Sequence, residues 1–262
     1  MPHDDDITHV LDYRKVRQII ISECTAEHVN LLETLIGKLA HRLMQLHGVL
    51  GVRVTIAKLE IFSDVICPWC YVGQARLEQA LAARPAAQPQ ITWMPYQLDS
   101  SLPEEGRDRR EYLLEKFGDV SHFDHAKKQL EQIGSSVGID FQFDAIQRTP
   151  NTRRAHLLIA RARRESPAHE AAMSVRLFRA YFTEGLDIGD PEVLCRLAAD
   201  TGLTAEAGRA ALVDEELSRE VTSLQDLVRR WNISGVPTFV FDRRFAFSGA
   251  QPLEVFLRAL DA

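Results

Sequence analysis

Two cysteines separated by two residues are the feature that most constrains the fold of this chain. Cys67 and Cys70 lie within the stretch IFSDVICPWCYVG, which begins with a short apolar run and precedes the amphipathic segment QARLEQALAAR. Pro68 suits the first turn of a helix, because proline lacks the N–H group that would have no partner there. The stretch therefore predicts a strand over residues 59–62, a helix over residues 68–83, and Cys67 at the junction between them.

The same cysteine spacing occurs in structural zinc sites and in redox-active dithiols. A structural zinc ion needs four ligands, but Cys24 and Cys195 each stand alone and no histidine pair has zinc-finger spacing. Four cysteines are also too few for a scaffold held by disulfides. A redox dithiol without a metal is the favoured interpretation. A zinc site and a buried pair of unreactive cysteines are the alternatives.

A redox dithiol assigns a different task to each cysteine. The N-terminal amides and the dipole of a helix stabilise a thiolate, so Cys67 is predicted to be the attacking nucleophile. Cys70 lies one turn further on, where it can resolve the mixed disulfide that Cys67 forms. Trp69 is expected to set the exposure and the electrostatics of the pair. Neither a GxGxxG motif after a strand nor a P-loop occurs, so no cofactor is expected.

A proline precedes an apolar run in the segment ISGVPTFVF, closer to the C-terminus. Pro237 is positioned for a cis peptide bond, which would leave the Val236 backbone free to pair with an extended substrate beside Cys67. The alternative is a trans proline that begins an edge strand. A CxxC motif at the tip of a neighbouring predicted strand favours the cis form.

The remaining pattern predicts an α/β fold with a large helical insertion. A second strand is expected in QITWMPYQL, a mostly helical stretch over residues 108–230, a hairpin over residues 238–247, and a final helix in QPLEVFLRALDA. Alternation of strands and helices implies a central sheet with a right-handed crossover. The helical stretch would then be inserted between the two halves of that sheet.

These motifs carry a resemblance to a known family. Residues 58–262 resemble the DsbA family of the thioredoxin superfamily, in its cytoplasmic FrnE-like branch, on the segments FSDVICPWCYVG, WMPYQLD, TPNTRRAH and GVPTFVFDRRFAFSGAQP. The resemblance implies a thioredoxin fold with an inserted helical domain, and a thiol–disulfide oxidoreductase or protein disulfide isomerase. It also implies that Cys67 and Cys70 are the redox pair and that Pro237 is the cis proline.

Related families with the same fold supply a second expectation. The 2-hydroxychromene-2-carboxylate isomerases and kappa glutathione transferases typically carry serine at the first cysteine position, so Cys67 favours disulfide chemistry over glutathione-dependent isomerisation. Asn151 and His156 match a segment that faces the active site in such proteins, and they are expected to bind the substrate together with Trp69 and Val236. A helix cap at Asn151 and an ordinary helical histidine at His156 are the alternatives.

Residues 1–57 form a separate segment with its own pattern. Two amphipathic helices are predicted over residues 12–47, and an alternating strand follows in VRVTIAKLE. This helix–helix–strand order resembles the C-terminal half of dihydroneopterin aldolase, an enzyme of the tunnelling fold, on LDYRKVRQII, HVNLLETLIGKLAHRLM and VRVTIAKLE. The resemblance implies that Glu33 would anchor the pterin, Lys58 would transfer protons and Tyr13 would line the pocket.

The aldolase family's first two strands, with their acid–base carboxylate, have no counterpart before residue 10. We therefore expect a truncated, vestigial pterin site without aldolase activity. In that case Glu33 is a capping-box residue and Lys58 is a solvated charge at a strand junction. Two further hypotheses stay open for residues 1–57: a retained pterin aldolase function, and oligomerisation through the apolar faces of the two helices.

Charge and composition limit the partners. The net charge is −6 and no long basic tract occurs, so nucleic acid is not an expected partner. The first residues, MPHDDDITHVLDY, lack the apolar core of a secretory signal, and no run approaches the roughly 18 apolar residues of a membrane span. A cytoplasmic protein is expected, with disulfide- or thiol-containing proteins or glutathione as partners and no membrane contact.

Overall fold

The chain divides into two compact units, residues 1–56 and residues 57–262. The computed structural model describes residues 13–25, 32–46, 49, 57–118 and 120–261.

The first unit contains the two helices that the apolar spacing predicts. Helix α1 (Tyr13–Thr25) and helix α2 (Leu32–Met44) contact each other, and Leu39 of α2 is buried. Of the strand predicted in VRVTIAKLE, residues 52–56 lie outside the described residues. Its last part, residues 58–60, belongs to the first strand of the second unit.

The second unit contains a mixed sheet and many helices. Its strands are β1 (Lys58–Ser63), β2 (Gln90–Pro95), β3 (Arg107–Asp108), β4 (Arg148–Thr149), β5 (Thr238–Phe241) and β6 (Phe245–Ser248). Its helices are α3 (Pro68–Ala83), α4 (Arg109–Phe117), α5 (Val120–Ser136), α6 (Arg153–Glu165), α7 (Pro167–Phe182), α8 (Pro191–Asp200), α9 (Ala205–Ala211), α10 (Glu215–Arg230) and α11 (Leu253–Leu260). Among the helices that the structure describes, none is both long and apolar enough to cross a membrane.

The four-stranded sheet has the order β2–β1–β5–β6. Strands β1 and β2 run parallel and α3 connects them, which is the crossover that the sequence predicts. Strand β5 pairs antiparallel with β1, so that Phe62 of β1 stands opposite Thr238 of β5. The C-terminal end of β1 therefore lies beside the start of β5. This register brings the loop after Ser63 next to the segment that precedes Thr238.

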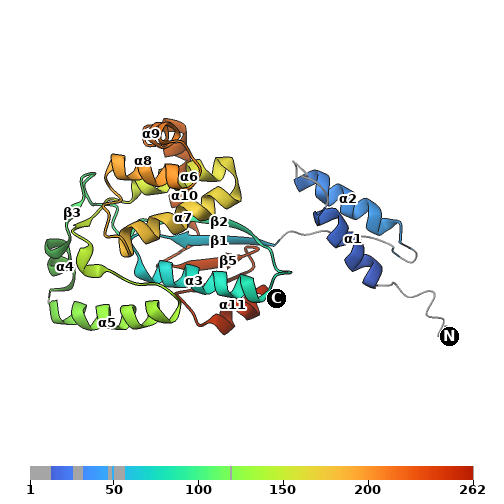
Figure 1. Cartoon of the computed structure of the whole chain (residues 1–262), viewed down its shortest axis with the longest axis horizontal. Coiled ribbons are helices and arrows are strands. Elements are labelled where there is room, and N and C mark those ends of the chain that lie inside the picture. Colours follow the sequence, from blue (N-terminus) through green and yellow to red (C-terminus); the bar gives the residue numbers. More distant parts are fainter. Residues whose placement is uncertain (1–12, 26–31, 47–48, 50–56, 119, 262) are drawn as a thin grey trace. The chain divides into compact units, whose positions relative to one another are not determined.

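The two faces of the sheet bury alternate residues of β1. Leu59 and Ile61 belong to a core shared with α3 and α11, which lie together on one side of the sheet (Figure 1). Phe62 packs on the other face with residues of α10, and its ring meets that of Trp231 edge to face, with 5.6 Å between the ring centroids. Because β1 is anchored from both faces, the cysteines that follow it start from a fixed position.

Helices α4–α10 lie between β2 and β5 in the sequence, and this part of the chain also contains a small ladder formed by β3 and β4. The sequence pattern does not predict this ladder, because strands of two residues are too short to show alternation. Gly106 precedes β3 with φ +69°, and a Cβ there would stand 2.6 Å from the carbonyl oxygen of Thr149. A glycine is therefore required where the two short strands approach each other.

A buried ion pair joins the helices to the outer edge of the sheet. Glu170 of α7 and Arg163 of α6 contact each other, with 2.9 Å between Arg163 Nε and Glu170 Oε1. Glu170 also accepts a hydrogen bond from the Trp93 N–H of β2 at 2.8 Å, and Arg163 Nη2 donates to the Trp93 carbonyl. The pair thus satisfies backbone groups on the free side of an edge strand. Burial raises the pKa of Glu170, against the lowering effect of the Arg163 charge.

Candidate functional site

Cys67 lies where the loop after β1 enters α3. Its backbone is extended (φ −92°, ψ 112°), and it occupies the N-cap position with Pro68 as the first helical residue. The Cys67 N–H donates to the Asp64 carbonyl at 3.0 Å, and the Cys67 carbonyl accepts from the Cys70 N–H at 3.0 Å. The thiol of Cys67 therefore stands at a helix N-terminus, where the helix dipole favours negative charge.

Cys70 is the more protected of the two thiols. Its exposed fraction is 1%, against 5% for Cys67, and both are free thiols. Burial raises the pKa of Cys70 well above its ordinary value, and a hydrogen bond with the Cys67 side chain acts in the same direction. Interactions with the Ser63 side chain and the Asp64 backbone oppose this shift and are weaker. Cys70 is therefore a protonated thiol at neutral pH.

The Val236–Pro237 peptide bond is cis, as the sequence predicts. The Cys67 thiol donates to the Val236 carbonyl, with 3.8 Å between the sulfur and the oxygen. Gly73 of α3 lets the helix approach this segment, because a Cβ there would stand 3.2 Å from Pro237 Cγ and 3.1 Å from Phe239 Cζ. Two parts of the predicted site that are distant in the sequence therefore meet at the Cys67 sulfur.

Asp64 is a candidate functional residue that the sequence reasoning missed. Its side chain is fully buried in the loop just before Cys67, although aspartate is almost never fully buried unless it is paired. Its Oδ2 accepts a hydrogen bond from the Leu98 N–H at 2.7 Å, and its Oδ1 lies 3.6 Å from His156 Nε2. The signal that could have identified it is a carboxylate inside the apolar run IFSDVIC.

His156 is buried rather than open to a ligand at the surface. Its exposed fraction is 4%, and its Nε2 lies 2.9 Å from the carbonyl oxygen of Tyr96. Together with Trp93 it lines a narrow internal cavity, and Trp93 Nε1 has no hydrogen-bond partner among the described residues. The His156 ring therefore contacts the loop after β2 and lies beside Asp64, whose Oδ1 has no hydrogen-bond partner among the described residues. Its direct contact with a substrate stays a prediction.

Asn151 uses both polar atoms of its carboxamide inside the protein. Its Oδ1 accepts from Gln97 Nε2 and from the Arg153 N–H, both at 3.0 Å, and its Nδ2 donates to the Leu102 carbonyl at 2.6 Å. These contacts suit the alternative of a cap-like role at the start of α6. Trp69 differs, because 37% of its surface is exposed and its ring is accessible to a substrate. For both residues, substrate binding stays a prediction.

The three residues of the predicted pterin site are divided between the two units, with Tyr13 and Glu33 in the first and Lys58 in the second. Tyr13 begins α1 and Glu33 lies in α2, and their side chains are outside the described ones. Lys58 begins β1 with an exposed side chain, and its backbone N–H donates to Asp242 Oδ1 at 2.7 Å. The backbone of Lys58 therefore takes part in the sheet of the second unit, and its role with a pterin stays a prediction.

The described residues contain no group of three or more His, Cys, Asp or Glu side chains that could hold a metal ion. In the same part of the chain, the side chains of Cys67 and Cys70 lie close enough to share a hydrogen bond.

The difference between the cysteines predicts an order of alkylation. Iodoacetamide at pH 7 is expected to label Cys67 first, because this residue occupies the N-cap position of α3, whereas the raised pKa of Cys70 keeps that thiol protonated. Cys195 is 98% buried in α8 and is expected to react slowly as well. Peptide mass spectrometry over a time course measures the order. Labelling in denaturant is the control, and equal rates for all thiols in the native protein would contradict the assignment.

Comparison with protein families gives two matches. Residues 58–261 match the family model described as DSBA-like thioredoxin domain. Residues 1–68 match the model of FolB, dihydroneopterin aldolase. The second match bears out the resemblance of the first unit to that enzyme, and it runs on through β1.

Comparison with individual proteins points the same way. The chain is 26% identical over 205 residues to the uncharacterized protein YwbO of Bacillus subtilis (strain 168), which covers 77% of this chain and 94% of YwbO. The solved structure of a probable DsbA oxidoreductase from Streptomyces coelicolor is 31% identical, with a TM-score of 0.71 over 78% of this chain and 88% of that chain. The cytosolic disulfide reductase DsbM from Pseudomonas aeruginosa, solved with GSH, is 22% identical, with a TM-score of 0.57 over 78% of this chain and 97% of that chain. The predicted thioredoxin fold with inserted helices is confirmed.

Proposed function

The chain belongs to the DSBA-like thioredoxin-domain family, and we propose that it is a thiol–disulfide oxidoreductase that works through Cys67 and Cys70. The observation that carries this proposal is the position of the Cys67 sulfur, at the N-terminus of α3 and 3.8 Å from the Val236 carbonyl oxygen. An extended substrate that pairs with the backbone at Val236 would bring its own sulfur to Cys67. Trp69 and Val236 are the residues proposed to contact that substrate.

The proposed reaction begins with the thiolate of Cys67. It attacks one sulfur of a substrate disulfide, so that the substrate S–S bond breaks, a mixed disulfide forms and one substrate thiolate leaves. The Cys70 thiol then gives up its proton and attacks the Cys67 sulfur, which releases the second substrate thiolate. The protein has lost two electrons and gained a Cys67–Cys70 disulfide, and the substrate has gained two electrons. The reverse sequence oxidises a substrate dithiol.

Return to the dithiol form needs a reductant, which we propose to be glutathione or a second dithiol protein in the cytoplasm. The glutathione-dependent isomerase of the 2-hydroxychromene-2-carboxylate type is the less favoured alternative, since a cysteine stands at position 67 where those enzymes typically carry serine. Residues 1–57 are proposed to be a separate domain that takes no part in the disulfide reaction.

Trapping of the mixed disulfide tests the proposed function. A Cys70→Ala variant lacks the resolving thiol, so it is expected to accumulate substrate proteins joined to Cys67 through a disulfide. Non-reducing electrophoresis of the variant, purified from its host, detects such species, and dithiothreitol should release them. The matched control is Cys195→Ala, which removes a buried thiol of α8 and should trap nothing. Equal trapping by both variants, or none by Cys70→Ala, would count against the proposal.

A further inference from the structure

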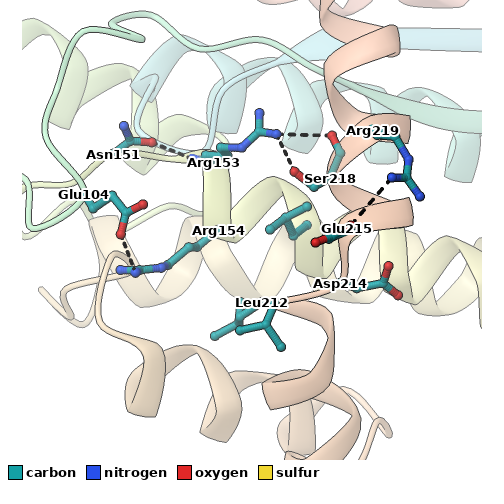
Figure 2. Close-up of a pocket in the computed structure, with 11 residues that line it drawn as sticks. Glu104, Asn151, Arg153, Arg154, Leu212, Asp214, Glu215, Ser218 and Arg219 are labelled. Carbon is teal, nitrogen blue, oxygen red and sulfur yellow. Dashed lines mark hydrogen bonds and ion pairs between the residues drawn. The ribbon is translucent and has the colours of Figure 1, made fainter.

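A groove of about 690 Å³ lies between the start of α6 and the turn from α9 into α10 (Figure 2). Its apolar part comes from Leu157, Leu212 and Val213, and 81% of the Val213 surface is exposed. Its polar part contains three arginines and three acidic residues. A concave site that combines apolar surface with a few charged groups is typical of ligand binding.

Two of the three arginines already have carboxylate partners in the groove. Arg154 Nη2 lies 2.8 Å from Glu104 Oε2, and Arg219 Nη1 lies 3.7 Å from Glu215 Oε2. The third acid, Asp214, caps α10 by accepting a hydrogen bond from the Leu217 N–H at 2.9 Å. These charged side chains therefore already interact with other groups of the protein.

Arg153 is the exception. Its Nη2 donates to three neutral oxygens of α10, namely the Ser218 carbonyl at 3.2 Å, Ser218 Oγ at 2.7 Å and Thr222 Oγ1 at 3.0 Å. Within the described part of the chain, no carboxylate lies within 4.0 Å of this guanidinium, and its Nη1 and Nε have no hydrogen-bond partner. The side chain is half-buried. Figure 2 shows it held against α10 at the edge of the groove.

A half-buried cation that is positioned but not neutralised favours an anionic ligand. A guanidinium has five N–H donors in a planar arrangement, and its preferred acceptor is a carboxylate or a phosphate. The adjoining apolar surface of Leu212 and Val213 suits the carbon chain of a peptide side chain better than an inorganic ion.

Hydrogen bonds connect the groove to the loop that precedes the dithiol. The Arg153 N–H donates to Asn151 Oδ1, which also accepts from Gln97 Nε2 at 3.0 Å. The next residue, Leu98, donates its N–H to the carboxylate of Asp64, three residues before Cys67. These contacts link the wall of the groove that contains Arg153 to the loop that precedes Cys67.

We propose that this groove binds a carboxylate of the substrate through Arg153, so that the preferred substrate class is a cysteine peptide with an acidic side chain close to its cysteine. This inference rests on the proposed dithiol function and adds a specificity-determining residue to it. The bound carboxylate accepts from the Nη1 or Nε N–H groups of Arg153, and its carbon chain lies over Leu212 and Val213.

Paired peptides test the inference. Each peptide carries one cysteine as a mixed disulfide with 2-mercaptoethanol, and either Glu or Gln at one to four residues from that cysteine. The readout is the ratio of the two second-order rate constants, Glu peptide over Gln peptide, for reduction by the pre-reduced full-length protein. At the favoured spacing the ratio is expected to be about 10, because a hydrogen bond between two charged groups is roughly twice as strong as a neutral one.

Variants assign the preference to the groove. Arg153→Gln is expected to bring the ratio close to one, and Arg219→Gln, which removes an arginine already paired with Glu215, is expected to retain it. Val213→Glu places a negative charge on an exposed position of the groove and should also lower the ratio, whereas Val213→Gln should not. If Arg153→Gln does not fold, the comparison of Val213→Glu with Val213→Gln tests whether the preference for the Glu peptide arises in the groove.

Two results would overturn the inference while leaving the dithiol function intact. One is a ratio near one at every spacing in the natural sequence. The other is a ratio above one that survives both Arg153→Gln and Val213→Glu. Failure of the protein to reduce either peptide would instead overturn the proposed function, and the groove inference with it.

Discussion

A Cys67→Ser variant is expected to lose disulfide exchange completely, with rates that fall to those of the uncatalysed reaction. The serine hydroxyl stays protonated at neutral pH and does not displace a thiolate from a disulfide, although it is nearly the same size as the thiol. Because Cys67 caps α3 without a side-chain hydrogen bond to the helix, the substitution should leave the fold intact. Reduction of insulin with glutathione as electron donor measures the loss.

A matched control separates chemistry from folding in this experiment. Cys195→Ala removes the buried thiol of α8 and should keep the exchange rate of the natural sequence, and circular dichroism should show all three proteins folded. Residual exchange by Cys67→Ser above the uncatalysed rate would show that another thiol attacks. An unchanged glutathione-dependent isomerisation of a 2-hydroxychromene-2-carboxylate by Cys67→Ser would favour the isomerase alternative.

Sequence reasoning can predict the dithiol because its signals are local. Cys67, Pro68 and Cys70 follow an apolar run and precede a helical pattern, and each residue type has a physical reason to stand there. Pro237 is also marked by the apolar run after it. Its meeting with Cys67 depends on the antiparallel register of β1 and β5, which is a long-range property. The CxxC motif at the tip of a neighbouring predicted strand indicates that pairing, and the resemblance to a known family implies it as well.

The residues that sequence reasoning missed act through tertiary contacts. Asp64 has no neighbour in the sequence that explains its burial, since its partners are the Leu98 N–H and His156. Arg153 stands in a run of basic residues, TRRAHLLIARARR. Only the fold shows that the adjacent Arg154 has a carboxylate partner, whereas Arg153 has none among the described residues. The strand pair β3–β4 leaves no periodic signal because each strand has two residues.

Among the predictions made for this protein, the largest effect on stability is expected when the ion pair between Arg163 and Glu170 is broken. Arg163→Ala would leave the Glu170 carboxylate, whose side chain is 2% exposed, buried without its cation. Removal of one partner from a buried pair costs about 3–5 kcal/mol of unfolding free energy. Arg164→Ala is the matched control, because the adjacent Arg164 forms more exposed pairs with Glu216 and Glu220, worth about 1 kcal/mol or less. Urea unfolding at pH 7 measures both.

The pH dependence of this loss identifies its cause. Burial raises the pKa of Glu170 in the folded protein, so over the range between the unfolded and folded pKa values the folded state holds the proton and the unfolding free energy falls as pH rises. Without the Arg163 charge the folded pKa rises further and this range extends upward from about pH 4.3. The destabilisation by Arg163→Ala should therefore be larger at pH 7 than at pH 5.

A second substitution in the same background completes the test. Glu170→Gln removes the charge that Arg163→Ala leaves buried, and its amide oxygen can still accept from the Trp93 N–H. The double variant should recover part of the lost unfolding free energy and lose the difference between pH 5 and pH 7. If the loss in Arg163→Ala is the same at both pH values, then it comes from the lost hydrogen bond to the Trp93 carbonyl at the edge of β2, and not from an uncompensated charge.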